Sequence, residues 1–277
     1  MRVLALFLVV PFMGAIIFAV ADRRAATEEQ PASVTAEQGE RRPVVVELFT
    51  SEGCSSCPPA DALLEKLDQA QLVSGAQVIP MSEHVDYWNY IGWTDPYSSA
   101  VFSRRQDGYA RRFGLQSIYT PQVVVDGATE LVGNDDRRIK EAIKKSSQAA
   151  KVEIRISPVT DTSGVPTVNV DVAPVSQPTG LKDAHLILAL ANNSAVSHVL
   201  RGENRGRELR HVAVVRSLTD LGRFNPIKGF SQSVPLTGEL KQWDGMRLIA
   251  FVQEREYGRI QGAAVRVLTV QERPKPE

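Results

Sequence analysis

The chain has 277 residues, of which 43% are hydrophobic, so it can form hydrophobic cores for two modest domains and is not a disordered protein. It carries 32 basic residues (Lys and Arg) and 32 acidic residues, which gives a formal net charge of zero. This balance excludes the strong bulk charge that would favour nucleic acid or an acidic membrane as a partner. Function must therefore be sought in local motifs.

Residues 1–21 are predicted to be an export signal. Arg2 precedes an apolar run that continues to Val20, and residues 19–21 (Ala-Val-Ala) have the small-x-small pattern of a cleavage site. Cleavage would release a periplasmic or secreted protein, whereas an uncleaved segment would anchor it to the membrane. Residues 22–42 hold almost no large apolar side chain and are expected to be a flexible linker.

Both cysteines, Cys54 and Cys57, lie between a predicted strand and a predicted helix. Residues 44–49 form a near-continuous apolar run, typical of a strand that is buried on both faces. Leucines recur at helical spacing over residues 60–72, which predicts a helix. The order strand, Cys-x-x-Cys, helix predicts a thioredoxin-like α/β domain over residues 43–150.

A second strand is predicted at residues 77–81, and it leads to His84. A right-handed crossover brings the carboxyl ends of both strands to one edge of a parallel pair, so we expect His84 and Asp86 to approach the cysteines. Five aromatic residues between positions 87 and 97 form either a small local core or a cover over a site. The other elements expected in this domain are a helix at 99–113, strands at 122–125 and 129–132, and a helix at 139–150.

From residue 151 onward the apolar pattern changes to period two, and Gly, Pro, Asn and Ser separate the short runs. This pattern predicts a smaller all-β, sandwich-like domain over residues 151–277. Its strands are expected at 152–156, 168–172, 185–190, 212–215, 247–252 and 265–270. Residues 201–210 hold four arginines and are interpreted as a solvated loop, which is also the best candidate for an anion site in this half.

These residues resemble a known family, the exported bacterial thioredoxin-like proteins catalogued as a domain of unknown function. The likeness covers about residues 43–270. The matching stretches are 47–61 (ELFTSEGCSSCPPAD), 84–88 (HVDYW), 92–96 (GWTDP), 119–122 (YTPQ), 125–127 (VDG), 201–207 (RGENRGR) with His211 and 214–216 (VVR), 252–253 (VQ) and 262–264 (GAA). Through the wider thioredoxin superfamily, the resemblance implies that the Thr120-Pro121 bond is cis and faces the disulfide.

A redox role is the functional interpretation of the cysteine pair. The thiolate is the nucleophile of disulfide exchange, and the positive end of a helix favours it. We assign Cys54 as the attacking group and Cys57 as the resolving group. Pro58 and Pro59 disfavour helical geometry at the residue before each, so the helix is expected to begin only after the pair. The two sulfur atoms are expected to be accessible to another molecule.

Two alternatives remain open for the cysteines. A structural disulfide would close a loop of four residues, which stabilises by roughly 2 kcal/mol, against nearly 5 for a loop of about a hundred residues. A metal site could combine the two thiolates with His84 and Asp86, since zinc and copper(I) accept such ligands. Only one Cys-x-x-Cys is present, however, so we expect no metal and no cofactor.

Two further residues are candidates for proton transfer. His84 could exchange a proton with a thiol, or it could be a hydrogen-bonded structural residue at a strand end. Glu47 alternates with Val45 and Phe49 on the first strand, which predicts a buried carboxylate near the cysteines. It could accept the proton of the resolving thiol, or it could pair with one of the arginines at 104, 105, 111 or 112.

The sequence thus predicts an extracytoplasmic thiol-disulfide oxidoreductase with Cys54, Cys57, Thr120, Pro121, His84 and Glu47 at its site. Its partners would be protein thiols or disulfides and a redox partner protein, with no nucleic acid. The competing hypothesis is an exported protein that binds a metal or a peptide, in which the cysteines are ligands or a static bond.

Overall fold

The computed structural model describes residues 41–160, 165–176, 181, 183–236 and 243–268. The predicted export signal, residues 1–21, lies outside them, and so does residue range 22–40 of the predicted linker. Arg42, the last residue assigned to the linker, instead begins the first strand. Among the described residues, no helix combines the length and the apolar character that crossing a bilayer requires.

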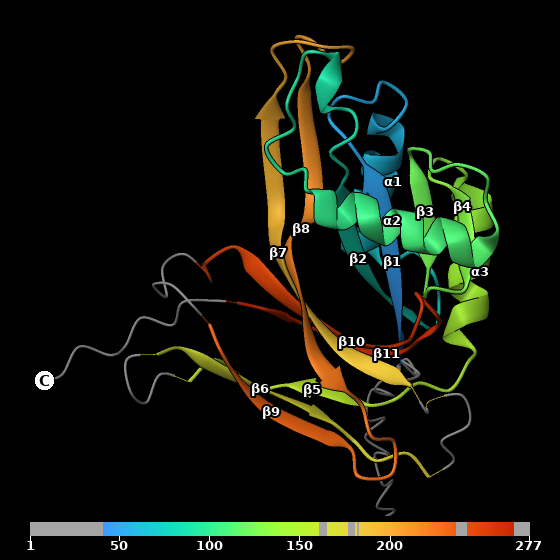
Figure 1. The fold of residues 1–277 in the computed structure, drawn as a ribbon, viewed down its shortest axis with the longest axis vertical. Coiled ribbons are helices and arrows are strands. Elements are labelled where there is room, and N and C mark those ends of the chain that lie inside the picture. Colours follow the sequence, from blue (N-terminus) through green and yellow to red (C-terminus); the bar gives the residue numbers. More distant parts are fainter. Residues whose placement is uncertain (1–40, 161–164, 177–180, 182, 237–242, 269–277) are drawn as a thin grey trace, which may run out of the picture. The chain divides into compact units, whose positions relative to one another are not determined.

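The described elements are seen in Figure 1. In chain order they are β1 (Arg42–Thr50), α1 (Pro58–Ala70), β2 (Ala76–His84), the 3-10 helix η1 (Asn89–Ile91), α2 (Ala100–Phe113), β3 (Gln122–Val125), β4 (Thr129–Val132), α3 (Asp136–Ser147), β5 (Ile154–Ile156), β6 (Thr167–Val172), β7 (Ala184–His198), β8 (Glu208–Arg223), β9 (Phe230–Pro235), β10 (Met246–Glu254) and β11 (Ile260–Val267). The helices and strands predicted before residue 150 are confirmed to within a few residues. Strand β9 was not predicted.

The predicted fold class, an α/β thioredoxin-like N-terminal domain followed by a smaller all-β domain, is wrong. Strands make up 43% of the structure and helices 20%. Eight strands form one mixed sheet in the order β11-β10-β7-β8-β2-β1-β3-β4, and β5-β6-β9 form a second sheet. The larger sheet is continuous across residue 150, because β8 pairs in parallel with β2 at Ser82 and Val214.

The length of the β7–β8 hairpin explains this difference. The two strands have 15 and 16 residues, although only residues 185–190 and 212–215 show the apolar pattern of a strand. Along its course β7 pairs with β10, and β8 extends far enough to meet β2. Two β-bulges interrupt the β7–β8 register, and such bulges bend a hairpin and increase its twist. The hairpin therefore belongs to both halves of the sheet.

Strand β1 is buried on both faces, as its apolar run predicts. Val44, Val46 and Leu48 pack against α1 and α3 in one core. Val45 faces the opposite way and contributes to a core that includes residues of α2, β10 and β11. A third core fills the space between the three-stranded sheet and strands β7 and β10.

Strands β1 and β2 are parallel, and Thr50 at the end of β1 lies opposite His84 at the end of β2. The two carboxyl ends therefore meet at one edge, as the predicted crossover requires. The cysteine loop begins at this edge.

Candidate functional site

The cysteine loop, residues 51–57, connects the end of β1 to the first turn of α1. Cys54 and Cys57 form a disulfide with their Cα atoms 5.4 Å apart. Helix α1 begins at Pro58, directly after the pair, as predicted. Cys57 is nevertheless in helical conformation (φ −77°, ψ −37°) and is the N-cap residue, so the expected loss of helical geometry there is wrong. The pair thus lies at the positive end of the helix dipole.

Both cysteines lie beneath the surface, contrary to the expected accessibility. Cys54 is 1% exposed and Cys57 is 0% exposed, while Ser55 and Ser56 between them are exposed. The Cys54 Sγ contacts the hydroxyl of Ser56 at 3.4 Å. Cys54 is therefore the sulfur that borders an exposed side chain.

The cover over the loop includes the tip of the β7–β8 hairpin, residues 199–207, which we call the hairpin tip. Asn204 is fully buried there, and its Nδ2 donates to the carbonyl oxygens of Glu52 and Cys54, at 2.9 Å each. The backbone amide of Ser55 donates to Glu203 at 3.2 Å. The arginines of residues 201–210 are exposed, as predicted, but the loop they occupy docks on the cysteine loop through Asn204.

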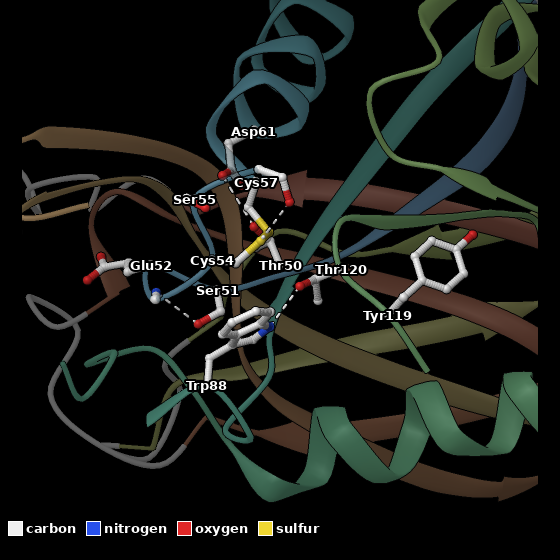
Figure 2. The surroundings of a disulfide bond; sticks show 12 residues. Thr50, Ser51, Glu52, Cys54, Ser55, Cys57, Asp61, Trp88, Tyr119 and Thr120 are labelled. Carbon is white, nitrogen blue, oxygen red and sulfur yellow. Dashed lines mark hydrogen bonds between the residues drawn. A yellow bond between two sulfur atoms is a disulfide. The ribbon is translucent and has the colours of Figure 1, made fainter. Parts of the chain in front are cut away.

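The Thr120-Pro121 bond is cis, as the resemblance implies. Trp88 Nε1 donates to the Thr120 hydroxyl at 2.8 Å, and Figure 2 shows both residues beside the disulfide. A Cβ on Gly133 would lie 2.8 Å from Pro121 Cβ and 3.2 Å from Ala60 Cβ. A glycine at this position therefore lets Pro121 lie close to the first turn of α1.

A group of ionisable side chains, which we call the histidine cluster, is buried behind the loop. Its members are Glu52, Asp61, His84, Asp95 and His211. His211 on β8 lies between two acids, with Nε2 3.5 Å from Glu52 Oε1 and Nδ1 3.5 Å from Asp61 Oδ1. The second half of the chain therefore contributes an ionisable group to the site.

His84 is a hydrogen-bonded residue of this cluster. Its Nδ1 lies 2.7 Å from Asp95 Oδ2, an oxygen that also accepts the backbone amide of Glu52 at 2.8 Å. Its ring meets the ring of His211 edge-on, with centroids 4.6 Å apart. Asp86 is placed elsewhere, because it accepts the hydroxyl of Ser103 on α2. His84 thus reaches the cysteines only through its neighbours in the cluster.

The burial of the cluster changes how its members titrate. Burial by itself would lower the pKa of His211, but the carboxylates of Asp61 and Glu52 outweigh it and raise that pKa from 6.5 to about 10. Burial likewise opposes ionisation of Asp95, yet His84 and the backbone amides of Glu52 and Tyr97 lower its pKa. His211 is therefore an imidazolium at neutral pH.

Glu47 lies on the other face of the sheet, in what we call the arginine cluster. The members of that cluster are Glu47, Glu83, Arg105, Tyr109 and Gln253. Glu47 accepts from Arg105 Nε at 2.6 Å and from the Tyr109 hydroxyl at 2.5 Å. Of the two interpretations of Glu47, the ion pair with an arginine is confirmed, and α1 packs on the opposite face of β1.

A metal site does not form from the candidate ligands. Among the residues that the structure describes, no group of three or more His, Cys, Asp or Glu side chains is arranged to hold a metal ion. The two sulfur atoms are bonded to each other, and Asp86 points to α2.

Sequence reasoning about the site missed five residues: Glu52, Asp61, Asp95, Asn204 and His211. All five lie in the stretches that carry the family resemblance, which was the available signal. Their roles were hidden because the contacts are long-range. Asn204, for example, reaches a carbonyl 150 positions earlier in the chain.

Two solved structures are similar to this chain. Protein AGR_C_4864 from Agrobacterium tumefaciens, known from a crystal structure, matches with a TM-score of 0.67 and 25% identity, over 86% of this chain and 99% of that one. HBP35 of Porphyromonas gingivalis matches with a TM-score of 0.56 and 16% identity, over 86% of this chain and 80% of that one. The second likeness concerns the fold alone.

None of the curated proteins matches the chain. A family model does match it, over residues 45–253, and its description is Protein of unknown function (DUF1223). The match contains the cysteine loop, the histidine cluster and the hairpin tip. The chain belongs to this DUF1223 family.

Proposed function

We propose that the protein is an extracytoplasmic thiol-disulfide oxidoreductase and that Cys54 and Cys57 are its reactive pair. The observation that supports this most is the place of the disulfide, which lies at the end of a parallel strand and at the N-terminus of α1. The cis Thr120-Pro121 bond beside it is a local feature that thioredoxin-like oxidoreductases share. Buried ionisable groups next to a cysteine pair provide sites for the protons that exchange requires.

The reaction is written here in the direction that reduces a substrate disulfide. The Cys54 thiolate attacks one sulfur of the substrate, which forms a mixed disulfide and releases the first substrate thiol. The Cys57 thiolate then attacks Cys54 Sγ, which restores the Cys54–Cys57 bond and releases the second thiol. Two protein thiols are oxidised and one substrate disulfide is reduced. Oxidation of a substrate dithiol is the exact reverse.

A purely structural disulfide is the weaker interpretation of this pair. The bond spans a sequence separation of three residues, and so short a loop constrains the unfolded chain little. Residues on both sides of it are already fixed by β1, by α1 and by the bonds from Asn204. Stability alone therefore gives little reason for a bond at this position.

The buried disulfide must become accessible before a substrate can react with it. A substrate sulfur can reach Cys54 only after the exposed segment at Ser55 and Ser56, or the hairpin tip above it, has moved. Exposed hydrophobic side chains lie near this end, with Tyr90 on η1 82% exposed and Leu200 on the hairpin tip 69% exposed. They suit contact with a polypeptide that presents its own cysteine. We infer that protein thiols or disulfides are the substrates, and that residues 1–21 direct the protein to the periplasm or outside the cell.

Trapping of mixed disulfides tests this function. The Cys57→Ser variant should accumulate mixed disulfides through Cys54, because the resolving thiol is missing. The Cys54→Ser variant should accumulate few, since Cys57 is the resolving group. The mixed disulfides that each variant traps are measured by mass spectrometry of periplasmic or secreted extracts, with and without reductant. Equal trapping by the two variants would refute the assignment of roles.

The reduction potential separates the proposed function from a static bond. Titration against glutathione should give a value in the range of exchange catalysts, between about −120 and −270 mV. A value well below about −300 mV would identify a static disulfide and leave the protein as a binding protein.

A further inference from the structure

His211 is enclosed by carboxylates that it does not hydrogen bond. The side chains of Glu52, Asp61 and His211 are at most 6% exposed, and the two ion-pair distances are 3.5 Å each. Both ring nitrogens, Glu52 Oε1 and Asp61 Oδ1 lack a hydrogen-bond partner. Buried polar atoms are almost always hydrogen bonded, so four atoms that face one another at ion-pair distance without a hydrogen bond call for an explanation.

Asp61 is the member of this group that lies next to the cysteine pair. Its backbone amide donates to the carbonyl of Cys57 at 3.1 Å, which places it one helical turn after Cys57 on the same face of α1. Its Oδ2 accepts the Thr50 hydroxyl at 3.2 Å, while Oδ1 has no donor. Figure 2 shows Asp61 on the Cys57 side of the disulfide, whereas the carboxylate of Glu52 points away from the sulfur atoms.

Four ionisable or polar groups face His211 from the elements packed around it. They are Glu52 from the cysteine loop, Asp61 from α1, His84 from β2 and Tyr97 from the segment before α2. The two carboxylates raise the pKa of His211 to about 10, against the effect of burial, so that the ring is cationic at neutral pH. His211 therefore places a positive charge 3.5 Å from Asp61 Oδ1.

We propose that Asp61 accepts the proton of the Cys57 thiol in the resolving step, and that His211, 3.5 Å from Asp61 Oδ1, is a positioning residue that holds this carboxylate in place. This inference rests on the function proposed above. The proton passes from Cys57 Sγ to an Asp61 oxygen, and the thiolate attacks Cys54 Sγ of the mixed disulfide. The leaving substrate thiolate takes up the proton when Asp61 releases it, so charge and protons balance over the step.

A single-turnover experiment tests the role of Asp61. Reduced protein is mixed with glutathione disulfide and quenched with acid, and the glutathione adduct on Cys54 is followed by mass spectrometry. Asp61→Asn should form the adduct at the wild-type rate but lose it at least about tenfold more slowly, at the low end of the range for general base catalysis. Glu65→Gln is the matched control, because it removes a carboxylate from the next turn of α1, outside the histidine cluster, and should slow this step less than about threefold.

The pH dependence of the same step tests the role of His211. In His211→Gln the pH profile of adduct loss should shift, because the charged ring beside Asp61 is gone. His198→Gln makes the same chemical change on β7, at a side chain that is 75% exposed, and should leave the profile unmoved. Asp61→Glu should recover part of the rate that Asp61→Asn loses.

The outcomes are distinct. Loss of the adduct at the wild-type rate in Asp61→Asn, or equal rates for Asp61→Glu and Asp61→Asn, would overturn the role of Asp61. An unshifted profile in His211→Gln would overturn the role of His211, while the proposed function would stand. If the wild-type protein forms no adduct and exchanges no thiols, the proposed function and this inference both fall.

Discussion

The arginine cluster and the histidine cluster lie on opposite faces of β2, and they differ in how their central cations, Arg105 and His211, are paired. Glu83 and His84 are neighbours on β2, yet each belongs to a different cluster because side chains alternate along a strand. Arg105 donates to Glu47, Tyr109 and Gln253, and both oxygens of Glu47 receive a donor. His211 has no hydrogen bond to either neighbouring acid.

We infer from this difference that the arginine cluster serves the stability of the protein and that the histidine cluster serves its proposed chemistry. In the arginine cluster, burial raises the pKa of Glu83 well above its usual range, and Arg105 Nε lies closer to Glu47 (2.6 Å) than to Glu83 (3.4 Å). This ion pair, with the bond from Arg105 to Gln253, suits a role in holding α2 to β1 and β10. Both clusters contain buried atoms without a hydrogen-bond partner, including both carboxylate oxygens of Glu83. Those of the histidine cluster lie beside the cysteine loop, which suits groups that exchange protons.

The largest effect on stability is expected when Arg105 is removed from the arginine cluster. Arg105→Ala should lower the free energy of unfolding by about 3 to 5 kcal/mol, because it leaves the Glu47 carboxylate buried without a counter-charge. Urea denaturation measures this value. Arg104→Ala, at the exposed neighbouring position, is the matched control and should change stability by less than about 0.5 kcal/mol. A stable Arg105→Ala variant that loses the thiol exchange proposed for the wild-type protein would show instead that the arginine cluster serves the chemistry.

The next largest effect is expected when the stability of the protein is measured as a function of pH. The folded protein holds a proton on His211 up to about pH 10, while the unfolded chain releases it near pH 6.5. Stability from this group is therefore complete below pH 6.5 and is lost as the pH rises to about 10, on the order of 3 kcal/mol between pH 7 and pH 10. Urea midpoints across this window should fall less in His211→Gln. Equal slopes would show that the ring is neutral when folded.

Removing the disulfide should have a smaller effect. The Cys54→Ala, Cys57→Ala double variant should lose about 2 kcal/mol or less, the chain-entropy value for a loop this short. Urea denaturation of both proteins at pH 7 gives the difference. A loss of 5 kcal/mol would instead make the disulfide a structural feature comparable to the arginine cluster.

The smallest effect is expected at the hairpin tip. Asn204→Ala removes two hydrogen bonds to buried carbonyls and should destabilise the closed tip by about 1 kcal/mol. Reduction of the disulfide by a phosphine should then proceed about five- to tenfold faster. Arg205→Ala, an exposed change on the same tip, is the control. An unchanged rate would show that the tip does not limit access to the sulfur atoms.

Local patterns predicted much of this molecule. The apolar run of β1 and the leucine spacing of α1 placed the elements around the cysteines to within a few residues. They could not show that β8 joins β2, because a single residue pair makes that junction. They also could not show which face Glu47 meets, since both faces of β1 are buried.

The site was harder to predict than the elements around it. Cys54, Cys57 and the cis bond at Pro121 follow from a short motif and a resemblance. Asn204 and His211 contact residues that lie some 150 positions earlier in the chain. Nothing in the sequence around either residue marks it as a neighbour of the cysteines. Long-range pairing in a sheet is set by tertiary structure and not by local propensity.

The bonds from Asn204 have a consequence for how the nascent protein matures. Its partner carbonyl at Cys54 precedes it by 150 residues, so the cysteines leave the ribosome roughly 10 to 30 s before the segment that covers them. During this interval the two thiols are open to any oxidant that they meet. The order of biogenesis thus allows the bond to form first and to be enclosed afterwards.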